Sequence, residues 1–137
     1  MSLVVDASVA LKWFVEEEGS DAAAALFGRP DPLIAPDLIV AEVCNAGWKA
    51  VRLGIMLPDQ LDHAAARLAA VLDELVPLAP LAPRAVAISC ALDHPVCDCV
   101  YLALAETRDA RLVTADRRLR RSVEGTTWSA RVVGLDA

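Results

Sequence analysis

Short apolar runs alternate with longer segments of helical spacing along this chain, and that alternation constrains its fold more than any other feature. Runs of three or four residues rich in Val, Leu and Ile are too short for helices and predict buried strands. They occupy residues 3–5, 33–35, 76–78, 111–114 and 131–133. Strands that alternate with helices pair in parallel, in a sheet that helices cover on both faces. We therefore expect an α/β three-layer sandwich with a short, mainly parallel central sheet flanked by helices.

The segments between these runs carry apolar residues three or four positions apart, which predicts amphipathic helices. Helices are expected between Asp6 and Gly19, over 20–27, from Asp37 to Gly54, over 58–75, 83–92 and 98–108, and in the arginine-rich segment after Asp116. Asp37 and Asp116 are well placed to cap the helices that follow them. The 76–78 run is the weakest strand prediction, and Pro77 favours a place for it at the edge of the sheet.

The length of 137 residues is typical of one domain, so we expect residues 1–137 to form a single domain with one site. No stretch approaches the roughly 18 uninterrupted apolar residues of a membrane span. The apolar N-terminal run has no basic segment before it and is followed by Asp6, which does not fit a secretory signal. These features predict a soluble protein of the cytoplasm. In that reducing compartment the cysteines are expected as small buried side chains rather than disulfides; they are Cys44, Cys90, Cys97 and Cys99.

The charge balance argues at first against a nucleic-acid partner, because the net charge is -6 and phosphate binding usually leaves a basic surface. The segment from Arg108 to Arg121 departs from that balance, with six arginines against two aspartates. This segment can form a basic face that holds RNA phosphates, or it can be the solvated surface of a helix. The candidate RNA-binding residues in it are Arg117, Arg118, Arg120 and Arg121.

Acidic residues follow two of the predicted strands, at the edge where ligands bind in open α/β sheets. Asp6 follows the first strand directly, and Asp116 comes two residues after the strand that ends at Thr114. Asp98 opens a predicted helix, and Glu42 lies about one turn into the third predicted helix. Each acid alone is explained as a helix cap or a surface residue. As a set that the chain can bring together, they predict a site.

A cluster of carboxylates without a basic partner is unfavourable, because like charges at close range repel and raise each other's pKa. A divalent cation relieves that repulsion. The side chains offered all carry oxygen donors, which suit Mg²⁺ or Mn²⁺ better than zinc; they are Asp6, Ser8, Glu42, Asn45, Asp98, Thr114 and Asp116. Such a site can lower the pKa of a bound water and neutralise charge on a phosphoryl oxygen. The donor set therefore favours hydrolysis of a phosphodiester bond.

The candidate site residues fall in four segments of the sequence: VVDAS (4–8), PDLIVAEVCNA (36–46), VCDCVYLALA (96–105) and LVTADRRL (112–119). In this order, the four segments resemble the four motif blocks of the PIN domain family. The resemblance covers most of the chain, and it implies a ribonuclease of the VapC toxin class with a PIN-like fold. The chain departs from the usual pattern in having cysteine on both sides of Asp98, which leaves the acid itself in place.

The resemblance also implies roles for individual residues. The acids that match the family pattern bind one or two Mg²⁺ or Mn²⁺ ions and activate water for RNA cleavage; they are Asp6, Glu42, Asp98 and Asp116. Ser8, Asn45 and Thr114 match residues that support the site. Proteins of this class usually form homodimers and are silenced by a cognate antitoxin, whose C-terminal segment wraps the toxin.

Other site chemistries fit the sequence less well. Four potential zinc ligands lie within ten residues, but their spacing matches none of the paired ligand motifs of common zinc sites; they are Cys90, His94, Cys97 and Cys99. His94 is expected instead as a turn residue before Pro95. A phosphoaspartyl enzyme would need a second acid where Ser8 stands and a lysine after a late strand, which the sequence lacks.

A non-catalytic α/β module that binds RNA or a protein remains the alternative from another class. In that case the acids cap helices or hold a structural ion, and the arginines after Asp116 carry the function. The large aromatic residues are expected in the core or in a dimer interface rather than in contact with bases; they are Trp13, Phe14, Trp48, Tyr101 and Trp128.

Overall fold

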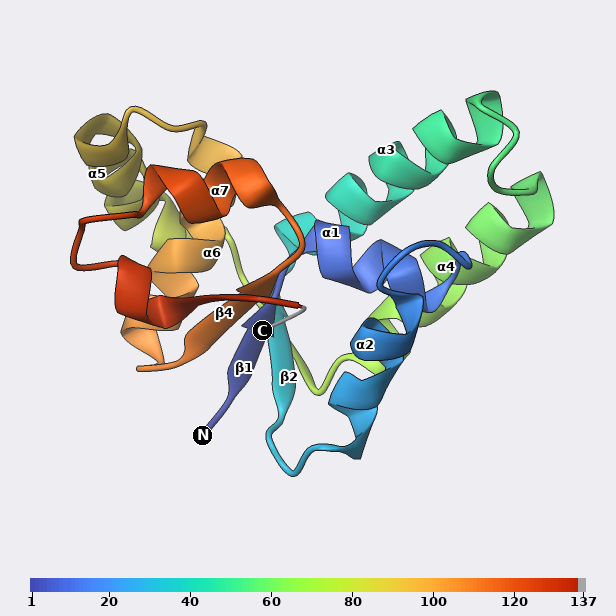
Figure 1. The fold of residues 1–137 in the computed structure, drawn as a ribbon, viewed down its shortest axis with the longest axis horizontal. Coiled ribbons are helices and arrows are strands. Elements are labelled where there is room, and N and C mark those ends of the chain that lie inside the picture. The colour runs from blue at the N-terminus through green and yellow to red at the C-terminus, as the bar shows by residue number, and fades with distance from the viewer. Residues whose placement is uncertain (136–137) are drawn as a thin grey trace.

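A five-stranded sheet forms the centre of the molecule in the computed structural model, which describes residues 1–135 (Figure 1). The strands are β1 (Leu3–Val5), β2 (Leu33–Pro36), β3 (Glu74–Val76), β4 (Arg111–Thr114) and β5 (Val132–Gly134). Their order is β3-β2-β1-β4-β5, and every neighbouring pair is parallel. The predicted α/β fold with a parallel central sheet is confirmed.

Helices flank this sheet and connect its strands. They are α1 (Ala7–Ala10), α2 (Ser20–Ala25), α3 (Leu38–Arg52), α4 (Pro58–Val71), α5 (Ala82–Leu92), α6 (Val96–Thr107) and α7 (Arg117–Ser122). Short 3-10 turns extend several of them: η1 (Leu11–Trp13), η2 (Leu26–Gly28), η3 (Ala79–Leu81) and η4 (Ser129–Arg131). Figure 1 shows α3 and α4 projecting side by side from one end of the sheet, while α5, α6 and α7 gather on the other side.

The core forms where α6 packs against β1, β2 and β4. Every residue from Cys99 to Ala105 is buried, so this helix is apolar around most of its circumference rather than along one stripe. No single helix within residues 1–135 is long and apolar enough to cross a membrane. The segments Ala79–Leu92 and Val96–Thr107 reach that length and composition only together, with a bend of 115° between them.

The third strand lies two residues earlier than its prediction. Helix α4 ends at Val71, so Leu75 belongs to β3 and not to the helix. Pro77 follows the strand because it has no N–H to donate to the sheet. β3 pairs only with β2 and therefore lies at an edge, as the proline indicated.

Two helix starts also differ from expectation. Asp37 precedes α3, but its carboxylate accepts a hydrogen bond from the Leu78 amide at 3.1 Å instead of capping the helix. Helix α6 begins at Val96 after the cap residue Pro95, so Asp98 is its third residue. Asp98 is therefore not the N-cap of α6, although its place in the first turn still sets its charge near the positive end of the helix dipole.

The cysteines within the described residues are all free, as expected, but only Cys99 is buried. Cys44 is half-buried, and Cys90 and Cys97 are exposed on the solvent-facing sides of α5 and α6. The prediction of burial was therefore wrong for Cys90 and Cys97.

Candidate active site

Asp6 lies at the carboxyl end of β1 and is buried, with only 6% of its surface exposed. Because β1 pairs with β4, with Val5 opposite Val113, the end of β1 lies beside Thr114. The Thr114 hydroxyl donates a hydrogen bond to Asp6 Oδ2, and the Ser8 hydroxyl donates to Oδ1 at 2.5 Å. The predicted grouping of Asp6, Ser8 and Thr114 is thus present as one hydrogen-bonded cluster.

Burial raises the pKa of the Asp6 carboxyl to about 6. Hydrogen bonds from Ser8, Thr114 and the Val9 amide favour the ionised form and oppose that rise, whereas the negative charge of Asp98 adds to it. Asp6 therefore carries a charge that its surroundings disfavour at neutral pH.

Glu42 lies in the second turn of α3 and is half-buried. The Tyr101 hydroxyl, from α6, donates a hydrogen bond to Glu42 Oε1 at 2.6 Å. The pKa of Glu42 is raised mainly by burial, and the charge of Asp98 contributes to the rise while the hydrogen bond from Tyr101 opposes it. The pKa of the buried Tyr101 phenol is raised by burial and by the Glu42 charge, so the phenol stays a donor.

Asp98 faces the same region from the first turn of α6. His94 Nε2 lies 2.6 Å from Asp98 Oδ2, and only 8% of the His94 side chain is exposed. The Ser89 hydroxyl donates to the His94 carbonyl at 2.5 Å, which fixes the turn between α5 and α6. Since the charge of Asp98 raises the pKa of both Asp6 and Glu42, these three acids share one region of negative potential.

Asp116 is placed differently from the other three acids. It caps α7, and its Oδ1 accepts hydrogen bonds from the amides of Arg118 at 2.9 Å and Leu119 at 3.4 Å. Its own amide donates to Thr114 Oγ1 at 3.0 Å. Asp116 is therefore joined to the Asp6 cluster through Thr114, and it has the cap role that the sequence indicated.

Three adjoining hollows lie beside part of this site, and of the four candidate acids only Glu42 lines one of them. The first, of about 420 Å³, is lined by Ser8, Lys12, Glu42, Asn45 and Lys49 among others. The second, of about 400 Å³, shares Lys12 and Ala115 with the first and also contains Thr114, Arg117 and Arg120. The third, of about 400 Å³, shares Arg117 and Arg120 with the second and adds Arg121. Arg118 is exposed and lines none of the three, so the candidate arginines separate into two groups.

His94 and Tyr101 are the site residues that sequence reasoning missed. His94 was expected only as a turn residue and Tyr101 only as a core residue, and each also holds one oxygen of an acid. Tyr101 stands three residues after Asp98 on α6, a spacing that places both on one side of that helix, and this was the available signal. His94 precedes the start of α6 at Val96, so helical spacing gave no signal for it.

The donor set suits a hard divalent cation. Asp6, Glu42 and Asp98 bring oxygen donors and like charge into one partly buried region, where a cation relieves the repulsion. As the side chains lie, Glu42 is turned to Tyr101 and Asp98 to His94. No three His, Cys, Asp or Glu side chains within residues 1–135 lie in a ready metal-binding arrangement.

Comparisons with known proteins agree on the kind of domain. A family model described as PIN domain matches residues 3–124. The chain is 34% identical to Ribonuclease VapC3 of Pyrobaculum aerophilum over 121 residues, which cover 87% of this chain and 92% of the relative. Among solved structures, PAE2754 from Pyrobaculum aerophilum matches with a TM-score of 0.72 and 20% identity, over 99% of this chain and 85% of the other. A toxin-antitoxin complex from Klebsiella pneumoniae matches with a TM-score of 0.68 and 18% identity, over 98% of both chains.

Proposed function

This chain belongs to the PIN domain family, and from that membership we propose that it is a metal-dependent endoribonuclease, the toxin of a VapBC-type toxin-antitoxin pair. The observation that carries the proposal is the convergence of Asp6, Glu42 and Asp98, in which the charge of Asp98 raises the pKa of the other two. The 34% identity to a protein named as a ribonuclease supports RNA as the substrate.

We assign the metal-binding role to four carboxylates, Asp6, Glu42, Asp98 and Asp116. When bound, one or two Mg²⁺ or Mn²⁺ ions would activate water and neutralise charge on the phosphoryl oxygens. Ser8 and Thr114 support the site because their hydroxyls fix both oxygens of Asp6. Asn45 supports it from the wall of the first hollow, next to Glu42.

The residues around these acids hold them in place. Tyr101 takes one oxygen of Glu42, and His94 takes one oxygen of Asp98, so each acid is oriented and keeps a second oxygen as a donor. Partners of this kind orient metal ligands, and their loss typically weakens metal affinity about 10- to 100-fold.

The protein's partner, location and oligomeric state belong to the same proposal. The solved toxin-antitoxin complex of the same fold supports a cognate antitoxin as a partner. We further propose that the protein acts in the cytoplasm as a homodimer, with residues 1–137 as its single domain.

The proposal is tested by incubating the purified, antitoxin-free protein with a structured RNA mixture in Mg²⁺ or Mn²⁺, with and without EDTA. We expect cleavage that requires the metal and leaves 5′-phosphate ends. Ca²⁺ in place of Mg²⁺ should permit RNA binding without cleavage, since the two ions differ in size and preferred geometry. Binding under all conditions with no cleavage over a broad RNA set would favour the non-catalytic binding module instead.

The arginine-rich helix α7 is expected to contact RNA phosphates through Arg117. Arg117→Gln should weaken RNA binding and reduce the slope of log affinity against log salt by about one, because one phosphate contact is lost. Arg117 lines both the second and third hollows. Arg118→Gln is the matched control, as Arg118 lies on the same helix outside the three hollows. Equal effects of the two substitutions on affinity and salt slope would contradict a substrate path along these hollows.

A further inference from the structure

Trp48 is an exposed aromatic residue on the helix that carries Glu42. Its exposed fraction is 49%, so of the two expected places, core or dimer interface, it does not belong to the core. The guanidinium carbon of Arg52 lies 5.0 Å from the centroid of the Trp48 ring. A cation over one face of a Trp ring is attracted by the ring's quadrupole, and this contact holds the ring while part of its surface stays open.

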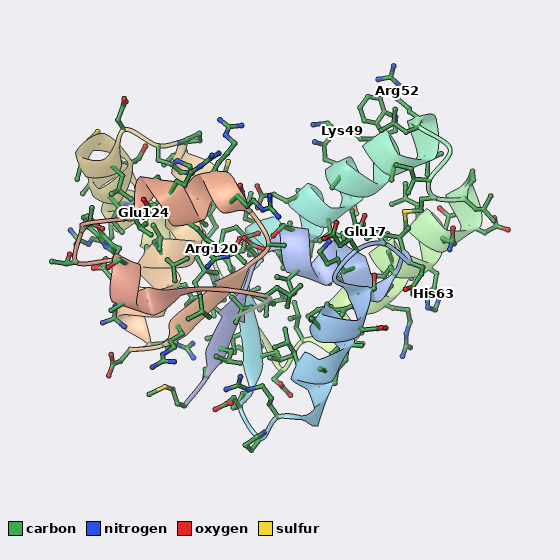
Figure 2. The ribbon with its side chains drawn as sticks, in the orientation of Figure 1. Glu17, Lys49, Arg52, His63, Arg120 and Glu124 are labelled. Carbon is green, nitrogen blue, oxygen red and sulfur yellow. The ribbon has the colours of Figure 1, made fainter. Side chains whose placement is uncertain are left out.

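Two cations accompany this ring. Figure 2 shows Lys49 and Arg52 projecting from the same side of α3, the side away from α4. Within residues 1–135, neither forms an ion pair with an acidic side chain. Cations elsewhere in that part of the chain do pair with acids; they are Lys12, Arg29, Arg84, Arg108 and Arg131. The positive charge beside Trp48 therefore remains available to a ligand.

The hollow at Trp48 adjoins the first hollow, which Glu42 lines, and the two share Lys49. Trp48, Lys49, Arg52 and Leu53 line a depression of about 300 Å³. Lys49 also lines the first hollow, with Glu42 and Asn45. A helix rises about 1.5 Å per residue, so Trp48 lies roughly 9 Å along α3 from Glu42. That separation is suited to a nucleotide near the scissile phosphate rather than to the phosphate itself.

We propose that Trp48, Lys49 and Arg52 form a nucleotide-binding shelf on α3, where an unpaired RNA base stacks on the Trp48 ring and Lys49 and Arg52 contact the neighbouring phosphates. This proposal rests on the ribonuclease function proposed above and adds a substrate subsite to it. Base stacking on an aromatic ring tolerates any base, because every base has a π-face. The shelf therefore supplies affinity and register rather than strict base identity.

Charge favours RNA over a protein as the occupant of this shelf. Trp and Arg are both enriched in protein interfaces, but lysine is depleted there, so Lys49, which has no ion-pair partner within residues 1–135, is the residue beside the exposed Trp48 ring that favours a polyanion. An aromatic residue beside Lys and Arg is the arrangement that single-stranded nucleic-acid sites use. The polyanionic substrate would bridge the acids through their metal and this shelf through its phosphates.

The test measures binding of a fluorescein-labelled single-stranded RNA of about 12 nucleotides, a length within typical site sizes, in Ca²⁺. Trp48→Ala should weaken binding at least about fivefold, and Trp48→Phe should restore most of it. Leu53→Ala is the matched control, because Leu53 is 75% exposed in the same hollow but offers neither a π-face nor charge. Each variant's oligomeric state is measured in parallel by light scattering.

A set of RNAs with one abasic nucleotide at successive positions makes the test specific. At one position the abasic RNA should bind wild type more weakly, and there Trp48→Ala should have no further effect, because the stacked base is already absent. A Trp48→Ala protein that binds every RNA like wild type would overturn the shelf. If the only change in Trp48→Ala is that its oligomer dissociates, the shelf is also overturned, because Trp48 then belongs to a protein interface. If wild type cleaves RNA in Mn²⁺ in either case, the proposed nuclease function survives.

Discussion

Asp98→Asn should abolish metal-dependent RNA cleavage while leaving the fold intact. The substitution removes the charge that raises the pKa of both Asp6 and Glu42, and with it one proposed metal ligand. Loss of a group that stabilises charge in the transition state typically costs about 100-fold or more in rate. Asparagine keeps the size of the side chain and can still hydrogen-bond to His94, so the melting temperature should change little. Cleavage rates and Mn²⁺ calorimetry on the same preparations measure both effects.

Asp109→Asn is the control for this chemical change. The Asp109 side chain is 88% exposed, pairs with Arg131, and contacts none of the four acids. His94→Gln should give an intermediate result, with Mn²⁺ affinity reduced about 10- to 100-fold, because it perturbs only the residue that orients Asp98. An Asp98→Asn protein that binds Mn²⁺ as tightly as wild type would remove Asp98 from the metal site and with it the basis of the proposed mechanism.

The parts of this site that sequence could predict are those fixed by strand ends. Asp6 follows one short apolar run and Thr114 ends another, and parallel pairing of β1 with β4 brings such ends together. From the sequence, Glu42 and Asp98 were expected on helices, and the length of the chain between them only allowed them to reach the same region. The family resemblance supplied the expectation that they meet. Their meeting depends on how α3 and α6 pack, which is a tertiary property that local patterns do not encode.

Two aromatic residues that shared one expectation, core or dimer interface, show the same limit. Tyr101 and Trp48 are both aromatic residues at helical spacing, yet one is buried against Glu42 and the other stands exposed beside Arg52. The difference arises because α6 lies across the sheet whereas the far end of α3 projects beyond it (Figure 1). Asp37 was likewise predicted as a cap from its position alone, but β3 runs close enough for the Leu78 amide to compete for its carboxylate.

The metal-free protein should lose stability as the pH rises from about 4 to about 7, because of Asp6. Burial raises the folded-state pKa of Asp6 to about 6, against an ordinary value of 3.8. Between these two values the folded state holds a proton that the unfolded state has released, so the free energy of unfolding falls as the pH rises. The shift corresponds to roughly 3 kcal/mol at 1.36 kcal/mol for each pKa unit. Thermal or urea unfolding in EDTA across this range measures the loss.

Asp6→Asn separates this contribution from those of other titrating groups. Without a charge at position 6, the variant should lose less stability than wild type over this pH range and should be the more stable protein at pH 7 in EDTA. Asp109→Asn, at an exposed site, should follow the wild-type curve. Saturating Mn²⁺ should stabilise wild type at pH 7 and leave Asp6→Asn unchanged, since a ligand that binds only the folded state adds its binding energy to stability. A wild-type curve that rises from pH 4 to pH 7 in parallel with that of Asp6→Asn would show that the Asp6 charge is not strained in the folded protein. The burial of Asp6 would then give no reason to expect a cation beside it.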